Sequence, residues 1–231
     1  QDWIGREETH EDYVARGPVK RLSAMLDRAD DSTAKNIPPL GHWLNFLPGA
    51  AQAELGPDGH PQRGGLIPPL PLPMRMAAGS RLTFHEPIPF GADVKRVSKI
   101  MNIVEKQGRT GPLAFLTYRY QVFSGATLCV TEEFDVVFRE KSGNAGPMPP
   151  GERREGKVSR TIDPQTPLLF RYSALTFNGH KIHYDREYAR NEEGYPGLLV
   201  HGPLLATLLV DLFRRHRPND TIKTFEFRAQ R

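Results

Sequence analysis

The sequence predicts an α+β protein made of two similar halves, in which antiparallel strands surround a helix. Long segments of alternating apolar and polar residues follow one another between residues 79 and 139, which is typical of an antiparallel meander. Each half also contains a helical apolar pattern. Residues 16–19 and 201–204 share one pattern, in which a basic residue or histidine is followed by Gly, Pro and an aliphatic residue. This short internal repeat favours two copies of one fold.

The first helix is expected to begin near Pro18. Val19, Leu22, Met25 and Leu26 follow the helical spacing of three and four residues, and proline suits the first turn because no amide hydrogen is needed there. This pattern predicts a short amphipathic helix.

Residues 36–79 are rich in proline and glycine, which disfavours a regular helix or a central strand over most of their length. Trp43, Phe46 and several leucines argue against disorder. A long segment of this kind in a compact domain is usually a lid or a binding loop. We therefore expect it to cover the entrance of a ligand pocket.

Four strands are expected after this loop, separated by Gly- and Pro-rich turns. They cover residues 81–85, 93–107, 113–123 and 126–139. Cys129 falls within the last strand and is expected in the core.

The chain is expected to divide into a first domain at residues 1–140, a linker at 141–157 and a second domain at 158–231. In the second domain an apolar helix begins at Pro203 and is expected to be buried on nearly all sides. Only residues 221–227 read as a strand after it. The second unit is therefore expected to be truncated or disordered at its end, or completed by a partner.

Composition excludes several functional classes. The single cysteine among 231 residues excludes an internal disulfide framework and a multi-cysteine zinc site. The net charge of +4 is spread along the chain, which argues against nucleic-acid binding and suits an anionic ligand. No apolar run is long enough for a membrane helix, and the start of the chain is polar. We expect a cytoplasmic protein, or a mitochondrial-matrix protein if the source is eukaryotic.

The densest group of reactive side chains lies between residues 176 and 185 and contains His180 and His183. Two histidines could bind a metal, but no carboxylate or cysteine is an obvious third ligand, so no metal is expected. They could also serve only as hydrogen-bonding groups of a polar core. The accompanying Asn, Lys and Asp residues favour a catalytic role.

Residues 172–185 and 195–204 resemble the hydratase segment and following helix start of MaoC-like hot-dog hydratases and dehydratases. The resemblance is strongest to the branch with mesaconyl-C4-CoA hydratase and the type 2 hydroxyacyl-thioester dehydratases. Residues 3–5, 81–85 and 131–135 resemble its noncatalytic first domain. This resemblance implies a double hot-dog fold, in which two antiparallel sheets each wrap a central helix.

The family motif reads Asp, any residue, Asn, Pro, an aliphatic residue and His. Overlaid on this chain, its histidine falls on His183 and its aspartate on Asn178, while His180 and Lys181 replace the Asn-Pro pair. The resemblance implies that His183 transfers the proton and that Asn178, which cannot titrate, orients the water.

The backbone amide of Gly202 is the candidate donor to the thioester oxygen, because helix N-termini have free amide hydrogens and favour negative charge. Pro203 has no amide hydrogen. Alternatively, the Gly-Pro pair only starts the helix. His180, Tyr172 and His201 are expected to bind substrate, and Asp185 is expected to cap a helix that begins at Arg186.

The resemblance implies hydration or dehydration of an α,β-enoyl-CoA thioester, with mesaconyl-C4-CoA to citramalyl-CoA as the specific expectation. Arg171 or Arg75 could bind the free carboxylate of such a substrate. The alternatives are a 3-hydroxyacyl-thioester dehydratase of fatty-acid metabolism, a noncatalytic acyl-CoA-binding subunit and a thioesterase. We expect no cofactor beyond the CoA of the substrate, and a homodimer.

Overall fold

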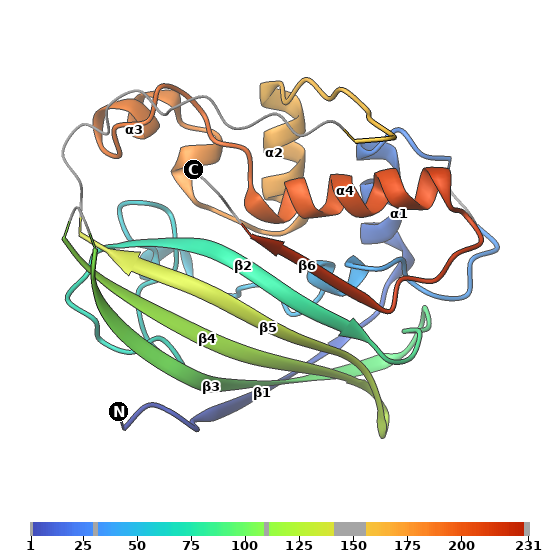
Figure 1. Ribbon diagram of the computed structural model, residues 1–231, viewed down its shortest axis with the longest axis horizontal. Helices are drawn as coiled ribbons and strands as arrows, with labels where there is room; N and C mark the ends of the chain where they lie inside the picture. The colour runs from blue at the N-terminus through green and yellow to red at the C-terminus, as the bar shows by residue number, and fades with distance from the viewer. Residues whose placement is uncertain (1, 30–31, 109–110, 141–155, 229–231) are drawn as a thin grey trace.

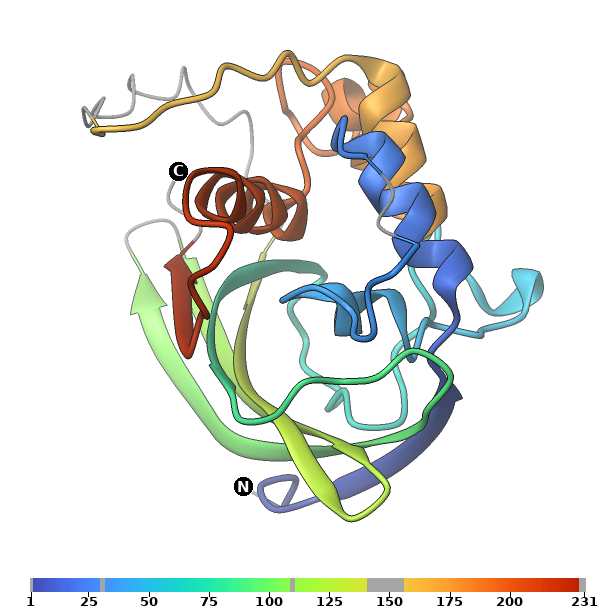
Figure 2. The same cartoon turned by 90° about the vertical axis from the view of Figure 1, so that its right-hand side faces the viewer.

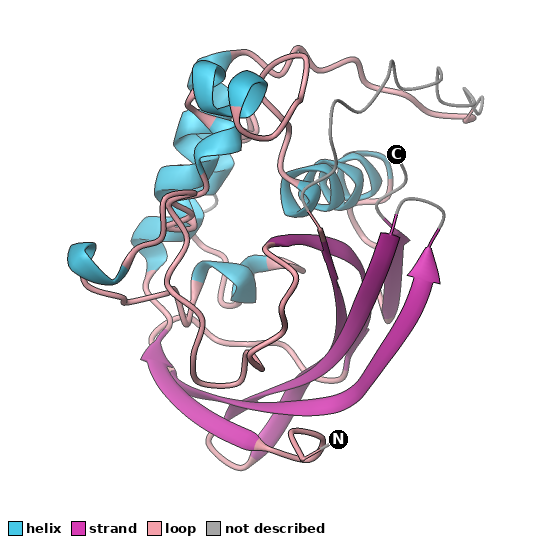
Figure 3. Ribbon diagram, turned by 90° about the vertical axis from the view of Figure 1, so that its left-hand side faces the viewer, coloured by secondary structure: helices cyan, strands magenta, loops and turns pink. Residues whose placement is uncertain are grey.

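The computed structural model describes residues 2–29, 32–108, 111–140 and 156–228. These residues form one antiparallel sheet with its helices gathered on one side (Figures 1 and 3), which confirms the α+β class. In chain order the elements are β1 (Glu7–Tyr13), α1 (Arg16–Met25), the 3-10 helices η1 (Gly41–Leu44) and η2 (Gln52–Glu54), β2 (Met74–Phe84), β3 (Asp93–Gly108), β4 (Gly111–Ser124), β5 (Thr127–Arg139), α2 (Thr166–Leu175), the 3-10 helix η3 (Lys181–His183), α3 (Arg186–Asn191), α4 (Gly202–His216) and β6 (Thr224–Arg228).

The strand order in the sheet is β1-β3-β4-β5-β2-β6. Strands β3, β4 and β5 lie where the alternating pattern predicts them, and Cys129 is fully buried as expected. Strand β2 begins at Met74, well before the predicted start at residue 81. It begins directly after the last proline of the loop, where its backbone can pair with the end of β5, as Met74 does with Arg139.

Strand β6 belongs to the second half of the chain but pairs with β2 of the first half. A Cβ atom on Gly79 would lie 2.5 Å from the carbonyl oxygen of Phe227, so glycine at this position allows the two backbones to approach. We expected a separate sheet for each half, but β6 of the second half lies in the sheet of the first half. The described strands form one continuous sheet, because β6 pairs with the edge of β2 that would otherwise be open.

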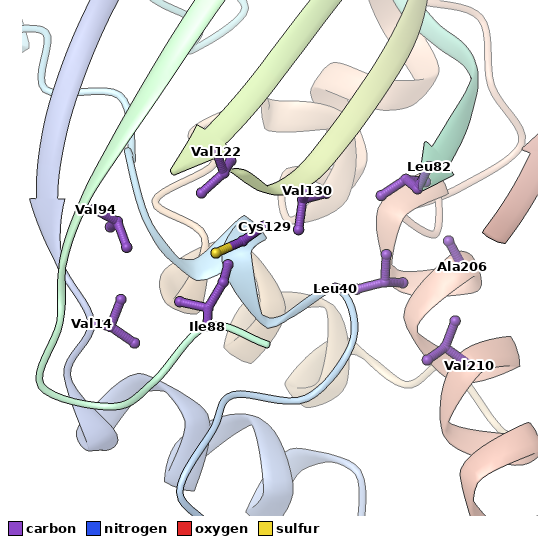
Figure 4. Close-up of a cluster of buried hydrophobic side chains, with 10 residues drawn as sticks. All are labelled: Val14, Leu40, Leu82, Ile88, Val94, Val122, Cys129, Val130, Ala206 and Val210. Atoms are coloured by element: carbon purple, nitrogen blue, oxygen red, sulfur yellow. The ribbon is translucent and has the colours of Figure 1, made fainter. Parts of the chain in front are cut away.

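The concave side of the sheet is covered by the segment around η1 and by α4 (Figure 2). Figure 4 shows Leu40 of this segment close to Leu82 of the sheet and to Ala206 and Val210 of α4. The indole of Trp43 donates a hydrogen bond of 2.9 Å to the buried carboxylate of Glu132.

Helix α1 does not occupy this central position. Its buried residues Leu22 and Met25 pack in a cluster with Leu169 and Tyr172 of α2 and Leu204 of α4. The helix begins at Arg16, so its Gly-Pro pair takes the second and third helical positions, whereas the pair in α4 takes the first two.

The prediction that the second-half helix is buried on nearly all sides is wrong for one face. Leu205, Leu209 and Phe213 are 51%, 55% and 37% exposed. They are four residues apart and therefore share a face, which points away from the sheet. The opposite face, with Ala206 and Val210, packs in the core.

A buried carboxylate fixes the far end of α4. Asp211, whose side chain is 2% exposed, receives ion pairs from Arg28 at 3.2 Å, from Arg160 at 3.2 Å and from Arg215 at 2.7 Å. The three guanidinium groups compensate the cost of burying its charge. They connect α4 to the chain that follows α1 and to the segment before α2.

The predicted linker at residues 141–157 lies outside the described residues except for its last two. Within the described part of the chain, no helix combines the length and the apolar character that crossing a bilayer requires.

Candidate active site

His183 lies in η3 and is 6% exposed. Its Nδ1 atom is 2.8 Å from the carbonyl oxygen of Leu199. A carbonyl can only accept, so Nδ1 carries the hydrogen and Nε2 keeps a free lone pair. Burial lowers the pKa of His183 to about 4, which keeps the imidazole neutral at pH 7. The side chain is thus a hydrogen-bond acceptor and a base with a fixed tautomer.

His201 and Tyr172 pack in succession against one side of the His183 imidazole. The ring of His201 stacks on that of His183 with centroids 3.6 Å apart, and Tyr172 packs edge-on against His201 at 4.9 Å. Ser173 of α2 holds Nε2 of His201 at 2.8 Å. His201 and Tyr172 are only 1% and 2% exposed, so the structure places both on the protein side of His183.

The Asn178 side chain is engaged in a local turn. Its Oδ1 atom accepts a hydrogen bond of 3.0 Å from the backbone amide of His180, which is the usual bonding of an asparagine in a turn. Its Nδ2 group remains a donor.

His180 is paired with a carboxylate that the sequence analysis did not single out. Its Nε2 atom is 3.1 Å from Oε1 of Glu193, and the two side chains are only 9% and 4% exposed. The His180 ring meets the His183 ring edge-on at 5.6 Å. The pair lies directly beside the proposed base.

The proline-rich loop also reaches this motif, through Asp58 and His60. Oδ2 of Asp58 is 2.9 Å from Nδ1 of His60, and the His60 ring lies 4.1 Å from that of His180. The amide of Lys181 donates a hydrogen bond of 2.9 Å to the carbonyl oxygen of Asp58. The loop is therefore in direct contact with the segment that carries His183.

Gly59 makes this approach possible. Its φ of +85° is in the left-handed region, and a Cβ atom there would lie 2.0 Å from the carbonyl oxygen of Gly179. Only glycine satisfies both conditions without strain.

Asp58, His60 and His180 could together hold a divalent cation. Each offers one ligand atom, and these atoms all lie within 4.8 Å of one another, in a two-histidine, one-carboxylate set known from metal sites. The loop thus supplies the additional ligands that the sequence around His180 lacks. The 2.9 Å contact between Asp58 and His60 also satisfies both groups without an ion.

Gly202 is the first residue of α4, and His201 is its N-cap. The first amides of a helix have no acceptor within the helix and lie at the positive end of its dipole. A Cβ atom on Gly202 would meet no heavy atom within 4 Å, so there is open space beside it. The structure therefore places a free amide one residue from the ring that stacks on His183.

The two candidate arginines have different environments. Arg171 is exposed on α2. Arg75 of β2 is half-buried and pairs across the sheet with Phe138, whose ring is covered by the guanidinium of Arg63. Burial lowers the pKa of Arg75. Among the described residues, none makes a hydrogen bond or an ion pair with its side chain.

Asp185 caps α3 as expected, because its Oδ1 atom accepts a hydrogen bond of 2.9 Å from the amide of Tyr188. The contributions of Asp58, His60 and Glu193 were not predicted. The Asp-Gly-His sequence at 58–60 is a turn signal inside a loop that already suggested function, and it could have drawn attention to the first two.

The chain is similar to known proteins in sequence and in fold. The family model for hydroxyacyl-thioester dehydratase type 2 matches residues 40–231. The mesaconyl-C4-CoA hydratase of Chloroflexus aurantiacus is 48% identical over 99% of this chain and 82% of that protein.

Two solved structures show the fold. A MaoC-like dehydratase from Phytophthora capsici matches with a TM-score of 0.70 at 15% identity, over 100% of this chain and 83% of that one. A Mycobacterium tuberculosis protein described as a double hot-dog matches with a TM-score of 0.55 at 13% identity, over 96% of this chain and 78% of that one. The predicted fold class is confirmed.

Proposed function

This chain belongs to the hydroxyacyl-thioester dehydratase type 2 family, and we propose that it adds or removes water across the double bond of an α,β-enoyl-CoA. The observation that carries this proposal is the state of His183: a buried, neutral imidazole whose Nδ1 is bound to a carbonyl and whose Nε2 has no hydrogen-bond partner among the described residues. Hydration of an enoyl thioester requires such a base for water.

In the proposed reaction, Nε2 of His183 takes a proton from water as the water oxygen attacks the β carbon. The same nitrogen then returns the proton to the α carbon. Asn178 orients the water through its Nδ2 donor, while its Oδ1 atom accepts the hydrogen of the His180 amide. The Gly202 amide stabilises the negative charge that develops on the thioester oxygen.

The remaining expected site residues support this centre. Three residues were expected to bind substrate. Of these, His180 lies beside His183 and is the one that we propose contacts the substrate directly. Tyr172 and His201 are buried behind the base, so their contribution in this conformation is to hold its ring. Neither a metal nor a cofactor has a step in this mechanism.

We propose a short, branched dicarboxylic acyl-CoA as the substrate, specifically mesaconyl-C4-CoA with citramalyl-CoA as the product. The 48% identity to the Chloroflexus enzyme of that name supports this choice. Arg75 supports it as well, because a half-buried guanidinium that makes no hydrogen bond or ion pair with the described residues suits a carboxylate ligand. A homodimer and a cytoplasmic location remain expectations.

The second candidate is a 3-hydroxyacyl-thioester dehydratase, which the family model favours. The chemistry is the same, and the length and charge of the acyl group differ.

A turnover screen distinguishes these functions. Hydration of mesaconyl-C4-CoA, crotonyl-CoA and a medium-chain 2-enoyl-CoA is followed by the loss of the ultraviolet absorbance of the conjugated enoyl thioester and by mass spectrometry, with free CoA measured in parallel. We expect mesaconyl-C4-CoA to be preferred. Preference for the medium chain supports the dehydratase, release of free CoA indicates a thioesterase, and binding without turnover indicates a noncatalytic subunit.

Arg75→Met provides a sharper test of the acyl group, with the exposed Arg171→Met as its matched control. Loss of a charged hydrogen-bonded pair should raise KM for mesaconyl-C4-CoA by about 10–100-fold and leave crotonyl-CoA unaffected. Equal KM values for wild type and Arg75→Met would exclude Arg75 as the carboxylate site.

A further inference from the structure

The position that holds a carboxylate in the wider family motif is Asn178 in this chain. Its carbonyl oxygen accepts the His180 amide hydrogen, and its Nδ2 group can only donate. A water molecule held for attack offers two hydrogens, and Nε2 of His183 accepts one of them. Asn178 is neutral and its Oδ1 atom already accepts one hydrogen bond, so an acceptor from another part of the chain is better suited to hold the second hydrogen.

His60 has the required chemical state. Both oxygens of Asp58 bind this residue, one its backbone amide at 3.0 Å and the other its Nδ1 atom at 2.9 Å. These hydrogen bonds help hold the pKa of Asp58 at about 2, despite the opposing effect of burial. The ionised carboxylate therefore fixes the hydrogen on Nδ1 of His60 and leaves Nε2 as an acceptor.

His60 also lies at the right place. Its ring is 4.1 Å from that of His180, which meets His183 edge-on. The backbone bond from Lys181 to Asp58 and the close approach of Gly59 to Gly179 fix the loop against the motif. The His60 side chain is still 21% exposed, so a small molecule can reach it.

The charges of the two imidazoles are coupled. Burial is the main cause of the lowered pKa of His183, and the charge of His60 contributes further to it. Burial also lowers the pKa of His60. Burial thus favours the neutral form of each ring, which is the form that two acceptors of one water need.

We propose that the Asp58–His60 pair belongs to the active site, where Nε2 of His60 is the second acceptor for the attacking water. This inference rests on the proposed hydration. The oxygen forms its bond to the β carbon while one O–H bond breaks and gives its proton to His183. The electron pair of the double bond then takes that proton at the α carbon. The other hydrogen stays on oxygen, bonded to His60, and nothing is oxidised or reduced.

Two substitutions of His60 separate this role from a structural one. Asparagine places its amide near the position of Nδ1 and can keep the bond to Asp58, but it has no acceptor at the far end of the ring. Glutamine reaches about the position of Nε2 and restores an acceptor there. A catalytic role therefore predicts that glutamine is the better replacement, and a structural role predicts asparagine.

The experiment measures kcat and KM for hydration of mesaconyl-C4-CoA and crotonyl-CoA by the full chain. We expect His60→Asn to lower kcat by about 10–100-fold, the effect of one hydrogen bond to a developing charge, with KM changed less than about threefold. His60→Gln should keep a clearly higher kcat than His60→Asn. His10→Ala, at an exposed position on β1, is the control and should match wild type.

The other outcomes are decisive as well. Full activity of His60→Asn, or lower activity of His60→Gln than of His60→Asn, overturns the inference while the proposed function stands. Loss of wild-type turnover on chelation, with recovery on adding zinc, also overturns it and assigns Asp58, His60 and His180 to a metal. A wild-type protein that hydrates neither thioester refutes the proposed function, and this inference with it.

Discussion

The imidazole ring of His201 lies nearly flat on that of His183, with centroids 3.6 Å apart and 18° between the planes. Two stacked imidazolium cations would repel each other in this buried setting. Burial lowers the pKa of His183 to about 4 and that of His201 to about 2. The stack is therefore neutral under physiological conditions, and we expect its two rings to influence the pH response of activity and of stability.

The first prediction concerns the pH dependence of activity. A general base must be unprotonated in the free enzyme, and kcat/KM reports its pKa. Because the pKa of His183 is lowered to about 4, kcat/KM should stay nearly constant as the pH falls from 7 to about 5. Initial rates across this range test it. An acid limb at the ordinary histidine pKa, about 6.5, would contradict the proposed environment of the base.

The second prediction concerns stability. The folded-state pKa of His201 lies below its value in the unfolded chain, so the unfolded state binds more protons once the pH falls below about 6.5. The free energy of unfolding should therefore be highest above that pH and decrease as the pH falls. At pH 5 the share of His201 is on the order of 1–2 kcal/mol.

Urea unfolding of wild type and His201→Gln at pH 7 and pH 5 measures this share. Glutamine does not titrate, so the variant should lose less stability between the two pH values. Identical losses would show that His201 takes up no proton on unfolding.

The third prediction compares the two residues of the hydratase motif. His183→Ala removes the proposed proton carrier and should lower kcat by about 10²–10⁴-fold or more, with substrate binding largely kept. Asn178→Ala should lose less, because the amide only positions the water. Single-turnover kinetics with mesaconyl-C4-CoA give both values. An active His183→Ala variant would show that the family motif is wrongly aligned with this chain and that another residue carries the proton.

The fourth prediction tests the anchor of α4. Asp211→Asn leaves three arginines without their buried anion, and breaking such a cluster should cost about 3–5 kcal/mol. Asp220→Asn is the matched control, because its ion pair with Arg217 is half exposed and should contribute less than about 1 kcal/mol. Thermal unfolding of both variants gives the comparison. Similar melting temperatures would mean that the Asp211 cluster adds no net stability.

The parts of the fold that depend on local pattern were predictable from the sequence. Strands β3, β4 and β5 alternate regularly between clear turns, and the helix starts follow from Gly-Pro pairs. The pairing of β6 with β2 was not predictable, because it joins segments that are distant in sequence and only Gly79 marks the contact. The exposed face of α4 was missed for a similar reason, since an apolar pattern does not show which side meets the sheet.

The candidate site divides in the same way. His183 and Asn178 lie in one short motif, and the resemblance identified them together. Asp58 and His60 reach the motif only through the folded path of the proline-rich loop, and Glu193 reaches His180 through the turn after α3. Their positions in the site depend on three-dimensional contacts, which cannot be predicted from the spacing of residues in the sequence.

The ladder between β6 and β2 joins the two halves of the chain in one sheet, and we expect them to unfold as a single cooperative unit. Residues 79–83 of the first half cannot release residues 224–228 without uncovering Leu82, which packs in the same cluster as Ala206 and Val210 of α4. Detachment of the second half would thus open the sheet and the core in one event, and partial unfolding that spares one half is disfavoured. His183 in one half and the proline-rich loop of the other keep their alignment for as long as this shared sheet persists.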